Sequence, residues 1–139
     1  MQFNTLSPNS LTNTTLVISS IAAGFPSPAE DYIDKRIDLN EHLINNPAAT
    51  FMVRVEGMSM VDCGINEGDV LLVDRALTAK DKDIILAVVD GEFTVKRLRK
   101  YSNRIELVPE NSSYPTIYIT EGIEFQVWGV VTYVIHKAS

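Results

Sequence analysis

The residue of this chain best suited to nucleophilic chemistry is a serine on a glycine-flanked turn. The stretch Gly57-Met58-Ser59-Met60 follows an apolar run and leads into Val61-Asp62-Cys63-Gly64. A sharp turn of this kind exposes the Ser59 hydroxyl and leaves neighbouring backbone N–H groups free to stabilise an oxyanion. The same residues also fit a plainer role, because Ser59 and Asp62 have the spacing of a capping box and Gly64 can end a helix. The turn pattern alone leaves both roles open.

A serine hydroxyl needs a base, and Lys96 is the candidate that the sequence offers. It lies in the apolar run Phe93-Thr94-Val95-Lys96-Arg97-Leu98, whose alternation as a strand places Lys96 on the face of Thr94 and Leu98. A protonated amine cannot accept a proton, so catalysis requires burial that lowers the lysine pKa. A solvated strand lysine is the plainer alternative. The always-charged guanidinium of Arg97 is expected to face solvent or to form an ion pair.

Other kinds of chemistry have less support. Cys63 could form a thiol dyad with His42 or His136, but no motif brings an imidazole to it, and a buried apolar role fits better. Several acidic residues are dispersed among turns, where caps are the expected role: Asp62, Glu67, Asp69 and Asp74. Because no histidine cluster or glycine-rich phosphate loop accompanies them, we expect neither a metal site nor a cofactor.

A third piece of the sequence is typical of a peptidase substrate. The run Ala23-Gly24-Phe25-Pro26-Ser27-Pro28 joins two small residues at the end of an uncharged polar segment. The preceding residues Leu16 to Ala23 are rich in β-branched side chains and can lie extended, as peptidase substrates do. Small residues let a backbone approach a crowded turn closely, and Gly24 lets it bend there. We therefore predict that the Ala23–Gly24 bond is a cleavage site.

These motifs together resemble the self-cleaving domain shared by the LexA repressor and the UmuD mutagenesis proteins. The resemblance covers about Gly24 to Ile135, and its most specific pieces are Gly57-Met58-Ser59-Met60 with Gly64-Ile65, and Gly68-Asp69-Val70-Leu71. The length of the chain, the run that begins at Gly24 and the absence of a DNA-binding domain favour the UmuD side. Met58 and Ala23 lean towards LexA, because UmuD proteins more often carry an acidic residue and a cysteine there.

The resemblance implies an activity and partners. It implies a serine endopeptidase with a Ser-Lys dyad, in which Ser59 is the nucleophile and Lys96 the general base, that cuts its own Ala23–Gly24 bond. Stimulation by a RecA filament on single-stranded DNA is implied as well. So is a cytoplasmic homodimer that serves an error-prone UmuC-type translesion DNA polymerase as accessory subunit in the SOS response to DNA damage. Small residues at the scissile bond fit this activity.

Two alternatives remain. One is an interaction domain with the same fold and an idle dyad. The other is a truncated relative of a LexA-like repressor, which would need a DNA-reading helix pair before the cleavage site, and 23 uncharged residues cannot provide one.

Composition limits the function classes. The chain has 139 residues, which suits one domain with a real core. A net charge of −6 argues against direct binding to nucleic acid, since the only dense basic run is Lys96 to Lys100. The single cysteine excludes an internal disulfide and fits a reducing cytosol. No apolar run approaches the roughly 18 residues of a membrane span.

The elements that must position these residues are mainly strands. Residues 1–24 carry no charged side chain and are predicted to form a flexible N-terminal arm that self-cleavage removes, while residues 25–139 form the peptidase and dimerisation body. Pro28 can open a helix over Ala29 to Lys35, and Asp38 can cap one over Leu39 to Asn45.

The body is predicted to be mainly β and strongly bent, because many short apolar runs are separated by turns. The expected strands are Phe51–Val55, Asp69–Asp74, Ile84–Val89, Glu92–Leu98, Arg104–Val108, Thr116–Ile119 and Phe125–Ile135. The dipeptide Asp90-Gly91 predicts a tight hairpin between two of them. The last strand is apolar on both faces, so we expect it to be interior or to bury a face or an edge in a dimer.

Overall fold

The computed structural model describes residues 3–5, 13–17, 23–24 and 34–139 of the chain. The chain divides into two compact units, one formed by residues 1–6 with 48–139 and the other by residues 7–47. Among the described residues, no helix has the length and apolar character needed to cross a membrane.

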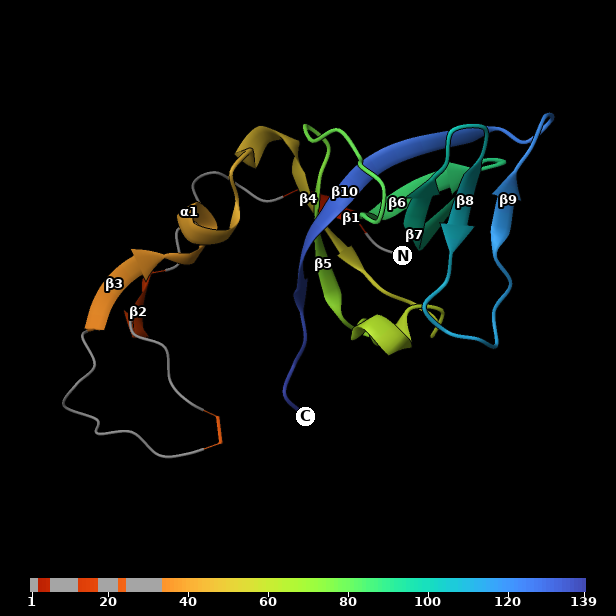
Figure 1. Cartoon of the computed structure of the whole chain (residues 1–139). Coiled ribbons are helices and arrows are strands. Elements are labelled where there is room, and N and C mark those ends of the chain that lie inside the picture. The colour runs from red at the N-terminus through yellow and green to blue at the C-terminus, as the bar shows by residue number, and fades with distance from the viewer. Residues whose placement is uncertain (1–2, 6–12, 18–22, 25–33) are drawn as a thin grey trace. The chain divides into compact units, whose positions relative to one another are not determined.

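The larger unit is built on one eight-stranded sheet in which all neighbouring strands are antiparallel (Figure 1). Across the sheet the order is β1 (Phe3–Thr5), β4 (Thr50–Arg54), β5 (Val70–Asp74), β10 (Phe125–Ile135), β6 (Ile84–Val89), β7 (Glu92–Lys100), β8 (Ile105–Val108) and β9 (Ile117–Ile119). Short 3-10 turns lie at Pro47–Ala49 and Val61–Cys63. This architecture confirms the predicted mainly β fold.

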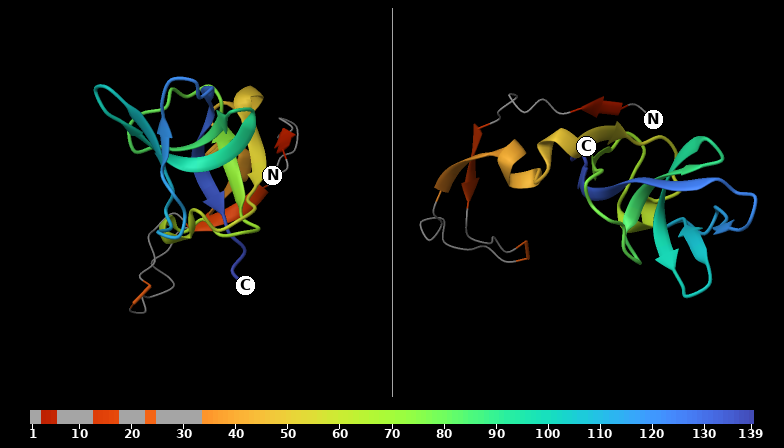
Figure 2. Two further views of the ribbon diagram at one scale, coloured as in Figure 1. Left: turned by 90° about the vertical axis from the view of Figure 1, so that its right-hand side faces the viewer. Right: turned by 90° about the horizontal axis from the view of Figure 1, so that it is seen from above.

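Strand β10 produces the bend that the sequence predicts. Its first half pairs with β6 and its second half with β5, and the register shifts once in each half. Bulges of this kind bend a strand and increase its twist. At the first bulge a Cβ on Gly129 would lie 2.6 Å from Cγ1 of Val73, so only glycine fits between the strands here. The long strand can be followed through the body in Figure 1 and in both views of Figure 2.

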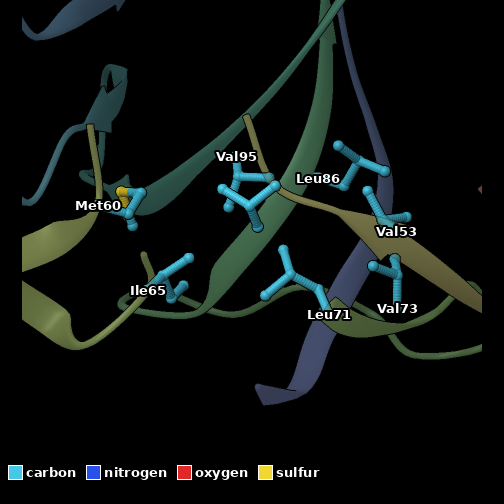
Figure 3. Packing of buried hydrophobic residues seen from close by; sticks show 8 residues of the cluster. Val53, Met60, Ile65, Leu71, Val73, Leu86 and Val95 are labelled. Atoms are coloured by element: carbon cyan, nitrogen blue, oxygen red, sulfur yellow. The ribbon is translucent and has the colours of Figure 1, made fainter. Parts of the chain in front are cut away.

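The core lies on both faces of the central strands. In β6, Leu86 belongs to one buried cluster, while Ile85 and Ala87 belong to another. The first cluster also gathers side chains from β4, β5, β7 and the loop after β4: Val53, Val55, Met60, Ile65, Leu71, Val73 and Val95 (Figure 3). Val55, Met60 and Ile65 belong to the loop between β4 and β5 that carries Ser59 (residues 55–69), called the serine loop below. Because these three side chains are part of the cluster, packing of the core also fixes the loop.

Most strand predictions agree with the structure to within one or two residues. Strand β7 runs on to Lys100, because its end pairs with the start of β8 at Ile105. The Asp90-Gly91 hairpin is confirmed, with both residues at positive φ, +48° and +81°, as a two-residue turn between right-twisted strands requires.

The smaller unit contains the antiparallel pair β2 (Asn13–Val17) and β3 (Asp34–Asp38), followed by helix α1 (Leu39–Leu43). The carboxylate of Asp38 accepts the Asn40 N–H at 2.9 Å, which confirms the predicted cap. The helix is shorter than predicted and ends at the extended Ile44.

The helix predicted over Ala29 to Lys35 is wrong at its end, because Asp34 and Lys35 pair with β2. The remainder of that helix lies outside the described residues. The predicted arm also has regular structure in its described part, since β1 pairs with β4 and β2 with β3. The extended segment predicted from Leu16 begins within β2, and residues 18–22 lie outside the described residues.

Candidate active site

Ser59 lies on the loop between β4 and β5, two residues after a bend at Gly57. That glycine has a φ of +88°, a conformation that side chains disfavour. Directly after Ser59, the side chain of Met60 is 2% exposed and packs into the core beside Ile65 and Val95 (Figure 3). The glycine therefore permits the turn, and the buried methionine holds it in place.

The structure separates the two roles that the sequence left open for Ser59. Met60, not Ser59, is the N-cap of the turn Val61–Cys63, and no side chain caps it. Gly64 ends this turn in the left-handed conformation, as predicted. The Ser59 hydroxyl contacts a lysine instead.

That lysine is Lys96, near the middle of β7 and only 9% exposed. Its Nζ lies 3.0 Å from Ser59 Oγ, 2.7 Å from Thr94 Oγ1 and 3.1 Å from the Val95 carbonyl oxygen. The contact with Thr94 agrees with the strand alternation, which places the two side chains on one face. The structure thus brings together the two residues that the sequence paired.

Burial lowers the pKa of the Lys96 amine below its ordinary value, because the charged form loses its hydration. The three hydrogen-bond contacts accommodate the neutral form. A neutral amine can donate its two N–H groups to Thr94 and Val95, and its lone pair then faces the hydroxyl of Ser59. This is the arrangement that a general base for a serine requires.

A pocket of about 140 Å³ lies beside the two side chains. Its wall combines residues of the serine loop with residues of β7, and it is lined by Val55, Glu56, Gly57, Ser59, Met60, Phe93, Thr94, Val95 and Lys96. Phe93 is 40% exposed, and its ring stands edge-on to Trp128 with centroids 5.9 Å apart. The pocket gives an extended peptide room to reach the hydroxyl.

Backbone donors near Ser59 are available for an oxyanion. In the described part of the chain, the N–H groups of Met58 and Ser59 have no hydrogen-bond partner, whereas those of Val61 and Asp62 have one each. Free N–H groups beside a nucleophile can stabilise the negative charge that develops on an attacked carbonyl oxygen.

The alternative nucleophile is in a different environment. The thiol of Cys63 is half-buried and donates to the Met60 carbonyl at 3.2 Å, and burial raises its pKa. An activated thiol has a lowered pKa. His136 contacts the buried carboxylate of Asp69 at 2.5 Å, and His42 lies in α1 of the smaller unit. No group of three metal-ligating side chains occurs among the described residues.

The predicted cleavage site lies in the smaller unit. Ala23 and Gly24 are exposed and form a bend. The residues on either side, 18–22 and 25–33, lie outside the described residues.

The sequence did not point to the support of the serine loop. Arg97 pairs with the Glu110 carboxylate at 2.5 Å, which confirms the ion pair expected as one of its two roles. The next residue, Asn111, donates from Nδ2 to the Met58 carbonyl at 2.9 Å. Since residues 110 and 111 are far from the serine in the chain and lie outside the motifs that carry the resemblance, only the fold revealed them.

Comparison with known proteins also indicates a peptidase. Residues 15–132 match the model of the family described as Peptidase S24-like. The chain is similar to Protein SamA of Salmonella typhimurium, with 51% identity over 83% of this chain and 79% of that protein. It is similar to Protein MucA of Escherichia coli, with 45% identity over 84% and 80% of the two chains. The LexA repressor of Paracidovorax citrulli is 38% identical over 87% of this chain and 54% of its own length.

Proposed function

Because this chain belongs to the Peptidase S24-like family, in its UmuD-like branch, we propose that it is a self-cleaving serine peptidase with Ser59 as nucleophile and Lys96 as general base. The observation that carries the proposal is the 3.0 Å contact between Lys96 Nζ and Ser59 Oγ, made by a lysine that is 9% exposed. A buried amine beside a hydroxyl on a sharp turn is what a serine peptidase without histidine needs.

The reaction follows from these contacts. Lys96 accepts the Ser59 proton while Oγ attacks the scissile carbonyl carbon, and the carbonyl electron pair moves to the oxygen. The backbone N–H groups of Ser59 and Met58 stabilise that oxyanion. When the carbon–nitrogen bond breaks, the Lys96 ammonium gives its proton to the leaving amine. Water then attacks the ester, with Lys96 again as base, and frees Ser59.

The proposed substrate is the chain's own Ala23–Gly24 bond. Both residues are small and exposed on a bend, which supports access by a peptidase site. Cleavage there would release residues 1–23 and leave Gly24 as the new N-terminus, one residue before the predicted start of the body at residue 25. Replacing Ala23 with Asp is expected to block cleavage through bulk and charge, with an unchanged thermal unfolding midpoint because the site is exposed. Unchanged cleavage of that variant would contradict the assignment of the bond.

The proposed role is that of an accessory protein in SOS mutagenesis. By resemblance to UmuD, a RecA filament on single-stranded DNA stimulates cleavage, and the processed cytoplasmic homodimer serves a UmuC-type translesion polymerase. Direct nucleic-acid binding is not proposed, because basic side chains of the β7–β8 region form ion pairs with acids: Arg97 with Glu110, Arg99 with Asp81, and Arg104 with Glu106.

An edge of β10 supports the homodimer. Among the described residues, β6 pairs with β10 only as far as Val130, so the other edge of residues 131–135 is open. Tyr133, Val134 and Ile135 on this segment are 45%, 38% and 46% exposed. An apolar strand with an open edge favours pairing with a second chain.

Mass spectrometry of the purified chain before and after incubation with a RecA filament tests the proposal. We expect the fragment Gly24–Ser139 from the parent chain and no fragment from Ser59→Ala. A stable fragment with another N-terminus would overturn the assigned bond. A chain that stays intact with the filament, and also after prolonged incubation at alkaline pH, would instead favour an interaction domain with an idle dyad.

A further inference from the structure

The loop after β8 is bound to the serine loop by several contacts. The Asp62 N–H donates to the Glu110 carbonyl at 2.8 Å, and the Glu110 N–H contacts Met60 Sδ at 3.4 Å. The Glu110 carboxylate is fixed in turn by Arg97, whose guanidinium also donates to the Lys82 carbonyl at 2.6 Å. The loop that carries Asn111 is therefore anchored to both the serine loop and β7.

The amide of Asn111 has a fixed orientation. Its Oδ1 accepts the Ser113 N–H at 3.0 Å, which forms a local turn of the kind asparagine favours. Its Nδ2 then points to the Met58 carbonyl oxygen at 2.9 Å. In the part of the chain that the structure describes, that carbonyl has one other donor, the Val61 N–H at the longer distance of 3.4 Å. Asn111 thus makes the shorter contact with the peptide group that precedes Ser59.

This contact bears on the oxyanion site through the geometry of one peptide bond. The peptide between Met58 and Ser59 is trans, and in a trans peptide the C=O and N–H groups point in opposite directions within one plane. Whatever fixes the Met58 carbonyl also fixes the direction of the Ser59 N–H. That N–H has no hydrogen-bond partner among the described residues, so no acceptor of its own orients it.

We infer that Asn111 is a positioning residue for the peptidase reaction, which aims the Ser59 N–H at the oxyanion by holding the Met58 carbonyl. The inference rests on the proposed function, since it assigns a part in the same reaction. Asn111 acts only through the serine loop and contacts no reacting atom. Its loss is expected to reduce the rate of the chemical step without changing the basicity of Lys96.

The test compares Asn111→Ser with the matched control Asn103→Ser on the exposed turn between β7 and β8. Serine at position 111 can still accept the Ser113 N–H but is too short to reach Met58. Self-cleavage is followed from pH 6 to 11. We expect the plateau rate of Asn111→Ser to fall about 10- to 100-fold, with the same pH midpoint and thermal unfolding midpoint as the control.

Three outcomes would overturn the inference: an unchanged plateau rate, a shifted pH midpoint, or a loss of stability that accounts for the lower rate. A second measurement separates the inference from the proposed function. The amide nitrogen chemical shift of Ser59 is expected to change in Asn111→Ser and to stay constant in Asn103→Ser. If the parent chain does not cleave, the proposed function fails, and this shift still supports or overturns the positioning role.

Discussion

Lys96 is stable in its buried position because its polar atoms are satisfied within the strand. Two of its three contacts are with Thr94 and with the Val95 carbonyl, both on β7 itself. Burying an amine has a low cost when the amine is both neutral and hydrogen-bonded. The neutral form meets both conditions and leaves the lone pair for Ser59. At the scale of single residues, the chemistry thus depends on the lysine losing its charge.

Removal of either dyad member is expected to abolish self-cleavage. Ser59→Ala deletes the attacking oxygen, and Lys96→Ala deletes the base, so each should lower the rate by on the order of 10³-fold or more. Lys100→Ala, a change of the same kind at the exposed end of β7, should cleave like the parent chain. The measurement is the rate of fragment formation at alkaline pH, and substantial cleavage by Lys96→Ala would point to another base.

Self-cleavage without RecA is expected to rise with pH and to level off above the pKa of Lys96 in the folded chain. Burial lowers that pKa, so the fraction of neutral amine grows from a lower pH than for an ordinary lysine. Time courses between pH 6 and 11 measure the profile, with Ser59→Ala as the control for chemical hydrolysis. A rate that is flat or falls with pH would rule out a neutral lysine base.

The same pKa shift predicts how stability depends on pH. Between the lowered pKa of folded Lys96 and the ordinary lysine pKa, the unfolded chain binds more protons than the folded chain, so the free energy of unfolding rises with pH in that window. Below the window the burial penalty is complete, and above it the penalty is absent. Urea unfolding measures the free energy of unfolding of Ser59→Ala and of the double variant Ser59→Ala, Lys96→Met. The difference between the two free energies should change with pH inside the window and stay constant outside it. A constant difference throughout would contradict this prediction.

At the scale of elements, β10 shapes the sheet, whereas β7 positions the lysine of the site. Strand β10 lies between β5 and β6 and bends at its bulges, which lets the sheet bury clusters on both faces of β6. Strand β7 presents Lys96 to the serine loop, while the next residue, Arg97, holds the loop after β8 through Glu110. Consecutive residues of one strand therefore connect to two different segments that bound the site.

Gly129→Ala is expected to destabilise the fold by about 1–3 kcal/mol through overpacking. The new Cβ would lie 2.6 Å from Val73 Cγ1 and 3.3 Å from the Asp74 carbonyl oxygen. Val73→Ala removes the closer neighbour, so the double variant should lose less stability than the sum of the two single variants. Urea denaturation of all four chains measures the coupling, and strictly additive losses would show that the two side chains do not clash.

At the scale of the whole molecule, the open edge of β10 and the paired basic side chains favour association with a second protein chain rather than with nucleic acid. The net charge of −6 points the same way, because phosphate binding needs free cationic side chains. The proposed homodimer would place this apolar edge out of water.

A charge on that edge is expected to produce monomers. Val134→Glu introduces a carboxylate that cannot be buried against a second strand without a large desolvation cost. Leu77→Glu changes a residue that is also exposed, at 45%, but lies outside β10, and should leave the oligomeric state unchanged. Sedimentation equilibrium measures both, and a dimer that persists in Val134→Glu would exclude this edge as the interface.

The sequence by itself determined the strands, the tight turns and the pairing of Ser59 with Lys96 as a hypothesis. Those features depend on local rules: alternation along a strand, the positive φ of Gly91 and Gly57, and the cap at Asp38. Such rules act within a few residues, so the printed sequence carries them. The domain division and the cleavage site remain predictions.

Only the tertiary structure decided how distant segments meet. The burial that lowers the pKa of Lys96, the 3.0 Å contact with Ser59, and the support from Asn111 all depend on how β7 and β8 pack beside the serine loop. The same holds for Lys35, where pairing with β2 overrides a local helix pattern. The free energies of strand pairing and of burial are sums over many contacts between residues that are far apart in the sequence. No local pattern in the sequence therefore contains them.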